Sequence, residues 1–149
     1  MRTDAAGGYA IELPAGASRE VFVHQAWGDQ VVARHGLELA SEARPTLEIL
    51  PRRTVRNRDR LRFTGVLPGP VCAERVVEVQ ARVGKRRWQV FRTARADGAC
   101  RFSARYRLRA THRRTVYRFR AHVPEQRGYP YLPGDSDVEP KRVKPDRGR

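Results

Sequence analysis

The side chains best suited to chemistry in this chain are four histidines and two cysteines, and their spacing is wrong for a metal site. The histidines are His24, His35, His112 and His122. No His-Glu-x-x-His or Cys-x-x-Cys pattern, either of which would bring two zinc ligands together, occurs in the sequence. We therefore predict no zinc site. We expect His112 to lie in a polar turn and His122 to point to solvent.

Acidic and hydroxyl side chains add little further chemistry. Asp135, Asp137 and Glu139 alternate along residues 134–139 and could offer oxygens to Ca²⁺. The simpler interpretation makes them polar residues of a turn and an edge strand. No serine stands in a Gly-x-Ser-x-Gly elbow, and no glycine-rich phosphate-binding loop occurs. We therefore predict no catalytic residues and no cofactor.

Basic residues dominate the charge of the chain, with 31 Lys and Arg against 16 Asp and Glu and a net charge of +15. The candidate polyanion-binding residues are Arg101, Arg105, Arg107, Arg109, Arg118 and Arg120. They take the outward phase of two predicted strands, and they would form one basic face if those strands pair within one sheet. The aromatic residues of the same strands take the inward phase, which disfavours nucleic acid because sheet-type nucleic-acid binders stack bases on outward aromatics. The alternative is a solvated basic surface with no binding role.

The elements that must position these residues are strands, because apolar and polar residues alternate along most of the chain. Tyr117, Phe119 and Ala121, for example, alternate with arginines, whereas no segment shows a sustained 3.6-residue apolar stripe. The predicted strands cover residues 8–14, 19–24, 30–39, 46–50, 60–67, 75–83, 87–93, 101–109, 115–123 and 138–143. Short strands separated by Gly, Pro and Asp turns are typical of an antiparallel β-sandwich. Residues 138–143 are expected at an edge, because Pro140 has no N–H to donate.

An approximate internal repeat divides the chain. Residues 4–23 and 97–119 share the same order of features: a turn with aspartate and glycine, a strand, a second turn and a second strand. This predicts that residues 1–43 are the C-terminal half of a truncated module, that residues 44–143 are a complete module and that residues 144–149 are a flexible tail. The alternative is one irregular domain. The apolar residues of the half-module would need cover from upstream sequence, from the complete module or from another chain, which would allow self-association.

Residues 46–143 resemble the immunoglobulin-like and fibronectin type III-like sandwich modules of secreted and cell-surface proteins of high-GC bacteria. The resemblance is carried by Phe63-Thr-Gly65, Val77-Glu-Val79, Trp88, Asp97-Gly98, Tyr117-Arg-Phe119-Arg-Ala121 and Gly134-Asp-Ser136. It implies an all-β, antiparallel immunoglobulin-like sandwich, preceded here by a partial second module. Such modules serve as spacers or binding units and share no catalytic residues. The chain departs from the family in being strongly basic and in its truncated-looking start.

Cys72 and Cys100 each precede a predicted strand, and a hairpin up and back separates them. Both thiols should therefore lie at the same pole of the sandwich. A bridge between them would stabilise the fold by about 3–4 kcal/mol, and it would persist only in an oxidising compartment. The alternative is two unpaired thiols that behave as small hydrophobic residues.

Three further aromatic residues lie near turns. Tyr129 and Tyr131 are expected to pack over the open end of the core, with an exposed ligand platform as the alternative. Trp27, next to Gly28-Asp29, is expected to pack in the turn of the half-module.

No apolar run approaches the roughly 20 residues of a membrane span, and the first residues lack an apolar stretch of signal-peptide length. The leading hypothesis is a non-catalytic structural or interaction module within a longer exported protein, located outside the cell or on its surface; the alternative location is the cytoplasm. Its partners would be other domains of the parent protein or an anionic surface polymer. The alternative function is binding of a polyanion: wall polymer, acidic polysaccharide or, less favoured, nucleic acid. An enzyme has no positive support.

Overall fold

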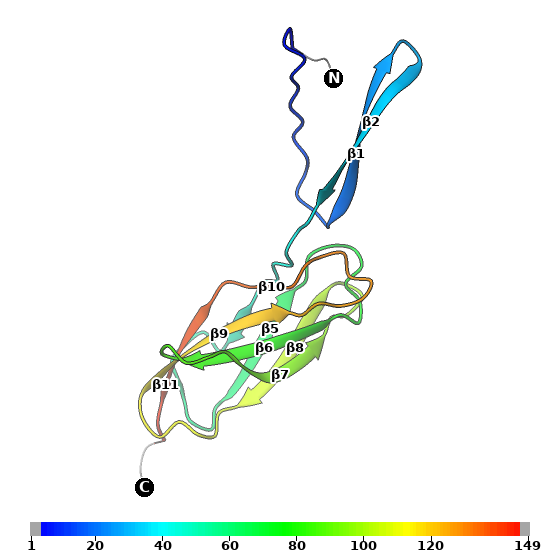
Figure 1. Cartoon of the computed structure of the whole chain (residues 1–149). Coiled ribbons are helices and arrows are strands. Elements are labelled where there is room, and N and C mark those ends of the chain that lie inside the picture. The colour runs from blue at the N-terminus through cyan, green and yellow to red at the C-terminus, as the bar shows by residue number, and fades with distance from the viewer. Residues whose placement is uncertain (1–3, 147–149) are drawn as a thin grey trace.

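The computed structural model describes residues 4–146, which form strands, turns and extended segments and contain no helix (Figure 1). The strands are β1 (Arg19–Trp27), β2 (Gln30–Leu39), β3 (Glu48–Leu50), β4 (Val55–Arg56), β5 (Arg60–Val66), β6 (Val76–Val83), β7 (Gln89–Arg95), β8 (Arg101–Arg107), β9 (Thr115–Val123), β10 (Gly134–Asp135) and β11 (Glu139–Lys144). The all-β prediction is confirmed. The prediction of strands at most of the alternating segments is confirmed to within a few residues.

The strands form three sheets. The smaller sheet of the sandwich has the order β3-β5-β8 and is antiparallel throughout. The larger sheet has the order β4-β11-β9-β6-β7, with β10 paired to β9. Its β4–β11 pair is parallel and its other pairs are antiparallel. The third sheet is the separate β1–β2 hairpin.

The core lies between the two sheets of the sandwich, because the inward phase of each strand is apolar. Phe63 from β5 and Phe119 from β9 are both buried, and their ring centroids lie 5.1 Å apart across the core. A second buried cluster includes Val77, Phe102 and Ala121 and fills the end of the sandwich nearer the hairpin. Burying these side chains supplies the main stabilising free energy of the sandwich.

Two strand predictions are wrong. Residues 8–14 alternate correctly but are unpaired and exposed, because no neighbouring strand within the described residues offers them a hydrogen-bonded edge. Residues 138–143 do not form an edge strand, since β11 pairs with β9 on one side and with β4 on the other. Pro140 is tolerated because β4 contacts only Val143 and Lys144, beyond the proline. The two-residue strands β4 and β10 are too short to give a periodic signal.

The β1–β2 hairpin projects from one end of the sandwich, and the extended segment that precedes it runs outward from the base of the hairpin (Figure 1). We call residues 8–40 the arm. Main-chain hydrogen bonds hold its base and the residue that follows it: Ser18 N–H donates to the Pro130 carbonyl at 2.8 Å, and Leu132 N–H donates to the Ser41 carbonyl at 2.8 Å. The Ser41 N–H also donates to the Ser18 hydroxyl, at 2.9 Å. The arm is thus tied to the sandwich by polar contacts at its base.

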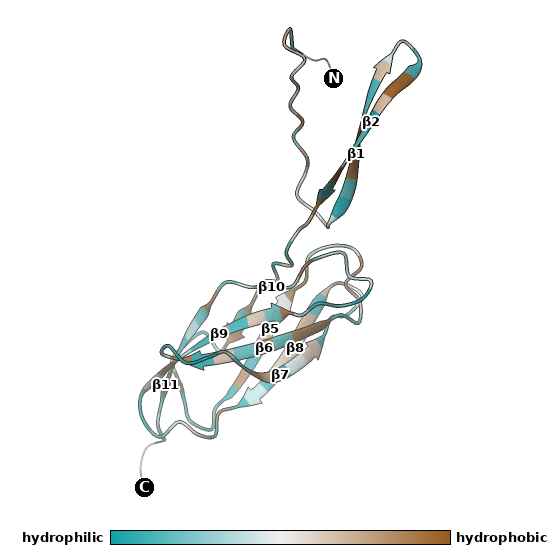
Figure 2. Cartoon of the chain, in the orientation of Figure 1, coloured by the Kyte–Doolittle hydropathy of each residue, from teal (hydrophilic) through white to brown (hydrophobic). Residues whose placement is uncertain are grey.

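Hydrophobic residues of the arm, among them those coloured brown on β1 and β2 in Figure 2, remain exposed. Tyr9, Ile11 and Leu37 are each 46–56% exposed, and none of the arm's side chains belongs to the two buried core clusters. That residues 1–43 are half of a module stays a prediction. The prediction of a tail at residues 144–149 falls partly outside the described residues; Lys144 itself belongs to β11, and Asp146 forms an ion pair with Arg58 at 3.0 Å.

Candidate functional site

The predicted basic residues divide between the two sheets of the sandwich. Arg101, Arg105 and Arg107 lie on the outer face of β8, in the smaller sheet, whereas Arg118 and Arg120 lie on β9, in the larger sheet. The condition for a single basic face is therefore not met, because β8 pairs with β5 and β9 pairs with β6. Arg109 is exposed but lies beyond the end of β8.

Pairing of β8 with β5 creates a different basic face. Arg60 stands opposite Arg107, and Arg62 stands opposite Arg105. With Arg101 these residues form what we call the arginine face, and all five side chains are exposed. Arg60 and Arg62 were missed as site residues, although their alternation with Leu61 and Phe63 already gives them the outward phase.

Few acidic groups neutralise the arginine face. Arg101 forms an exposed ion pair with Asp97 at 3.5 Å. The Asp97 carboxylate also accepts backbone N–H bonds from Arg101 and Ala99, both at 2.9 Å. The hydrogen bond from the Arg101 backbone is the main cause that lowers the pKa of Asp97 below its ordinary value. Asp97 is therefore an anionic turn residue whose carboxylate is bonded by backbone N–H groups of its own turn as well as by the Arg101 side chain.

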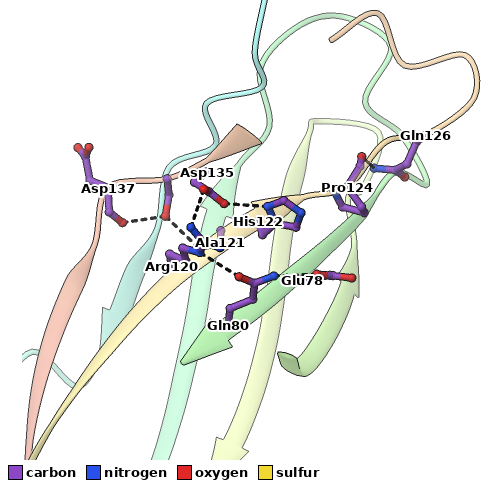
Figure 3. Close-up of polar contacts among 10 residues, drawn as sticks. Glu78, Gln80, Arg120, Ala121, His122, Pro124, Gln126, Asp135 and Asp137 are labelled. Carbon is purple, nitrogen blue, oxygen red and sulfur yellow. Dashed lines mark hydrogen bonds and ion pairs between the residues drawn. The ribbon is translucent and has the colours of Figure 1, made fainter. Parts of the chain in front are cut away.

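Arg120 lies in a polar network on the outer face of the larger sheet (Figure 3). Its guanidinium pairs with Asp135 at 2.6 Å and donates to the Gln80 amide oxygen at 2.9 Å. Asp135 also contacts His122 Nδ1, at 2.8 Å. The Arg120 guanidinium further lies over the Trp88 ring, 4.4 Å from its centroid. With its side chain only 21% exposed, Arg120 is a structural residue of this sheet rather than a free cation.

The same network includes residues of the acidic segment 134–139, the candidate Ca²⁺ ligands. Both carboxylate oxygens of Asp135 are already engaged, one by Arg120 and one by His122. Ser136 is buried and its hydroxyl accepts the Ala121 N–H at 2.9 Å. Within residues 4–146 no group of three or more His, Cys, Asp or Glu side chains is arranged to hold a metal ion. His122 does not point freely to solvent as expected, because Asp135 holds it against the sheet.

Cys72 and Cys100 form a disulfide, with their Cα atoms 5.1 Å apart. The predicted bridge and its place at one pole of the sandwich are confirmed. Cys72 is buried in the core cluster, and the Leu67 N–H donates to the Cys100 carbonyl at 2.9 Å. The bridge thus joins the loop before β6 to the turn before β8, and so links segments that lead into different sheets.

Tyr129 packs at this same pole. It is buried, its hydroxyl donates to the Pro68 carbonyl at 2.8 Å, and its ring lies 5.1 Å from the ring of Tyr131. Burial raises the pKa of Tyr129 to about 12. These contacts agree with the packing interpretation. Trp27 differs: it is 81% exposed at the tip of the hairpin, so its expected turn packing is wrong.

Lys141 has a buried side chain that carries an ammonium group. Its Nζ donates a hydrogen bond to the Pro51 carbonyl at 2.5 Å. Desolvation by burial lowers the pKa of this lysine, an effect that Glu139 opposes. This hydrogen bond links β11 to the turn after β3.

No helix among the described residues is long and apolar enough to cross a membrane. Comparison of the chain with protein-family models gives no match. Comparison with curated proteins gives no match either.

Proposed function

We propose that this chain is a non-catalytic structural or interaction module of an exported bacterial protein, built on an immunoglobulin-like or fibronectin type III-like sandwich. The observation that carries the proposal is the Cys72–Cys100 disulfide. Disulfides persist in oxidising environments, and they are rare in the reducing cytoplasm. A bridge that links loops leading into both sheets suits a domain that must stay folded outside the cell.

A further observation supports an interaction role. The arm presents exposed apolar side chains such as Ile11 and Leu37, and the outer edges of its two strands are unpaired within the described residues. Exposed apolar surface and open edges are features of contacts with other domains or chains.

The thiol state of the protein in its own cells tests the proposal. Free thiols are blocked by alkylation in intact cells, and the protein is then isolated and its mass measured before and after reduction. We expect Cys72 and Cys100 to escape alkylation until the bridge is reduced. Two alkylated cysteines in the untreated protein would contradict an exported module and would favour the cytoplasmic alternative.

A second candidate function, the binding of an acidic polymer, is favoured by the arginine face. The pairing of Arg62 with Arg105 and of Arg60 with Arg107 places like charges directly opposite each other on an exposed sheet.

A further inference from the structure

The arginine face places like charges next to each other across β5 and β8, which opposes the pairing of these two strands. Like charges directly opposite on neighbouring strands destabilise the pair, and β5 and β8 contain two such pairs in succession, Arg60–Arg107 and Arg62–Arg105. Cross-strand partners lie about 4.5–5.5 Å apart at Cβ. The guanidinium groups are therefore close enough for one bound anion to contact both members of a pair.

The hydrogen bonds of these arginines leave donors free. Arg62 uses Nε toward the Ser103 hydroxyl at 3.4 Å, and Arg107 uses Nε toward the Arg58 carbonyl at 3.0 Å. No ion pair from Arg60, Arg62, Arg105 or Arg107 to a carboxylate occurs in the part of the chain that the structure describes. Each guanidinium keeps the planar pair of donors that suits phosphate, sulfate or carboxylate.

A second acidic residue on this side of the small sheet, Glu48, does not neutralise the paired arginines. Glu48 on β3 stands opposite Thr64 of β5, on the outer side of the same sheet. Its carboxylate pairs instead with Arg52, at 2.6 Å. The outer surface of the small sheet therefore keeps its positive charge.

The face also indicates the kind of anion. Its side chains between the arginines are short and polar, chiefly Thr64 and Ser103, which stand opposite each other. The aromatic residues of β8, Phe102 and Tyr106, take the inward phase, so the face offers no ring on which a base could stack. Outward residues recur along a strand at about 6.6–6.8 Å, which suits a linear polymer with charged groups at a similar repeat.

We infer that the arginine face of β5 and β8 binds a linear, base-free polyanion that carries phosphate or sulfate groups. The polymer runs along the strands, and its anionic groups contact the Arg60–Arg107 and Arg62–Arg105 pairs. The inference rests on the proposed function, because it names the partner of the interaction module.

The test measures fluorescence anisotropy of the 149-residue chain with three labelled probes: poly(glycerol phosphate), a heparin-derived oligosaccharide and single-stranded oligodeoxythymidylate. The variant is Arg62→Ala with Arg105→Ala. The matched control is Arg86→Ala with Arg87→Ala, which removes the same charge from the exposed turn between β6 and β7. Each titration is repeated at NaCl concentrations from about 50 to 300 mM, because counterion release makes the affinity for a polyanion fall with salt.

We expect the face variant to bind the two base-free probes at least about tenfold more weakly, since two charge-assisted contacts are lost. Its salt slope should fall by about 0.7, because the Arg62–Arg105 pair contacts one anionic group and each phosphate contact on a flexible strand contributes about 0.7. The control should stay within about twofold of the unsubstituted protein. Preference for the phosphate or the sulfate probe then identifies the source of the anionic groups.

Equal weakening in the control would overturn the inference, because net charge alone would then explain binding. Tighter binding of the oligodeoxythymidylate than of either base-free probe would also overturn it, in favour of nucleic acid. If Arg62→Ala with Arg105→Ala alters the urea midpoint, the variant Arg62→Lys with Arg105→Lys replaces it, and we expect weaker binding at unchanged charge. If the unsubstituted protein binds neither base-free probe but its cysteines are bridged in cells, only this inference is contradicted. If it binds the probes but its cysteines are free in cells, only the exported module is contradicted.

Discussion

Removal of the Cys72–Cys100 bridge should lower the stability of the sandwich by an amount that the chain length of the closed loop determines. The two cysteines are 28 residues apart in sequence. For a loop of this size the chain-entropy relation gives about 3.6 kcal/mol at 25 °C. A domain of about 100 residues loses about 4–8 °C of Tm per kcal/mol, so the double variant Cys72→Ala with Cys100→Ala should melt roughly 15–30 °C lower.

Urea unfolding of the 149-residue chain, followed by far-UV circular dichroism, measures this effect. The oxidised protein is compared with the double alanine variant and with the unsubstituted protein in dithiothreitol. The last two should agree with each other, and dithiothreitol should leave the double variant unchanged. A loss of less than about 1 kcal/mol would refute the reasoning, because the bridge would then not restrict the unfolded chain as the relation requires.

Three other changes have definite expected outcomes. Gly65→Ala should destabilise the sandwich by about 1–3 kcal/mol in urea unfolding, because an added Cβ would lie 2.0 Å from the Thr46 carbonyl oxygen, whereas Gly98→Ala meets nothing within 4 Å and serves as the control. Burial raises the pKa of Tyr129 to about 12 from 10.0, so its folded form holds the proton more tightly and stability should fall as pH rises from 10 toward 12; Tyr129→Phe should flatten that decline in urea midpoints. Removal of residues 1–40 should change the unfolding free energy of the sandwich by less than about 1 kcal/mol, since surface contacts alone hold the arm; a larger loss by calorimetry would show that the arm belongs to the core.

The sequence predicted the strands of the sandwich well, because their inward residues repeat with period two. β9 has the expected bounds, and its inward residues Phe119 and Ala121 are buried as predicted. Residues 8–14 show the same alternation yet form no strand. Alternation reports which side chains share a face, whereas a strand also needs a partner edge, and that partner is set by long-range pairing. The same limit explains why the inner position of β11 was missed.

The candidate site shows how much cross-strand neighbours decide. Arg120 and Arg62 both take the outward phase of a strand, so alternation alone does not show which of them is free to bind an anion. Pairing with β6 sets Arg120 beside Gln80, and the turn at β10 brings Asp135 to its guanidinium, so its charge is used within the fold. Pairing with β8 instead sets Arg62 opposite another arginine. An arginine is therefore available to an external anion only when its neighbours across the sheet do not neutralise it, and a total charge of +15 does not distinguish the two cases.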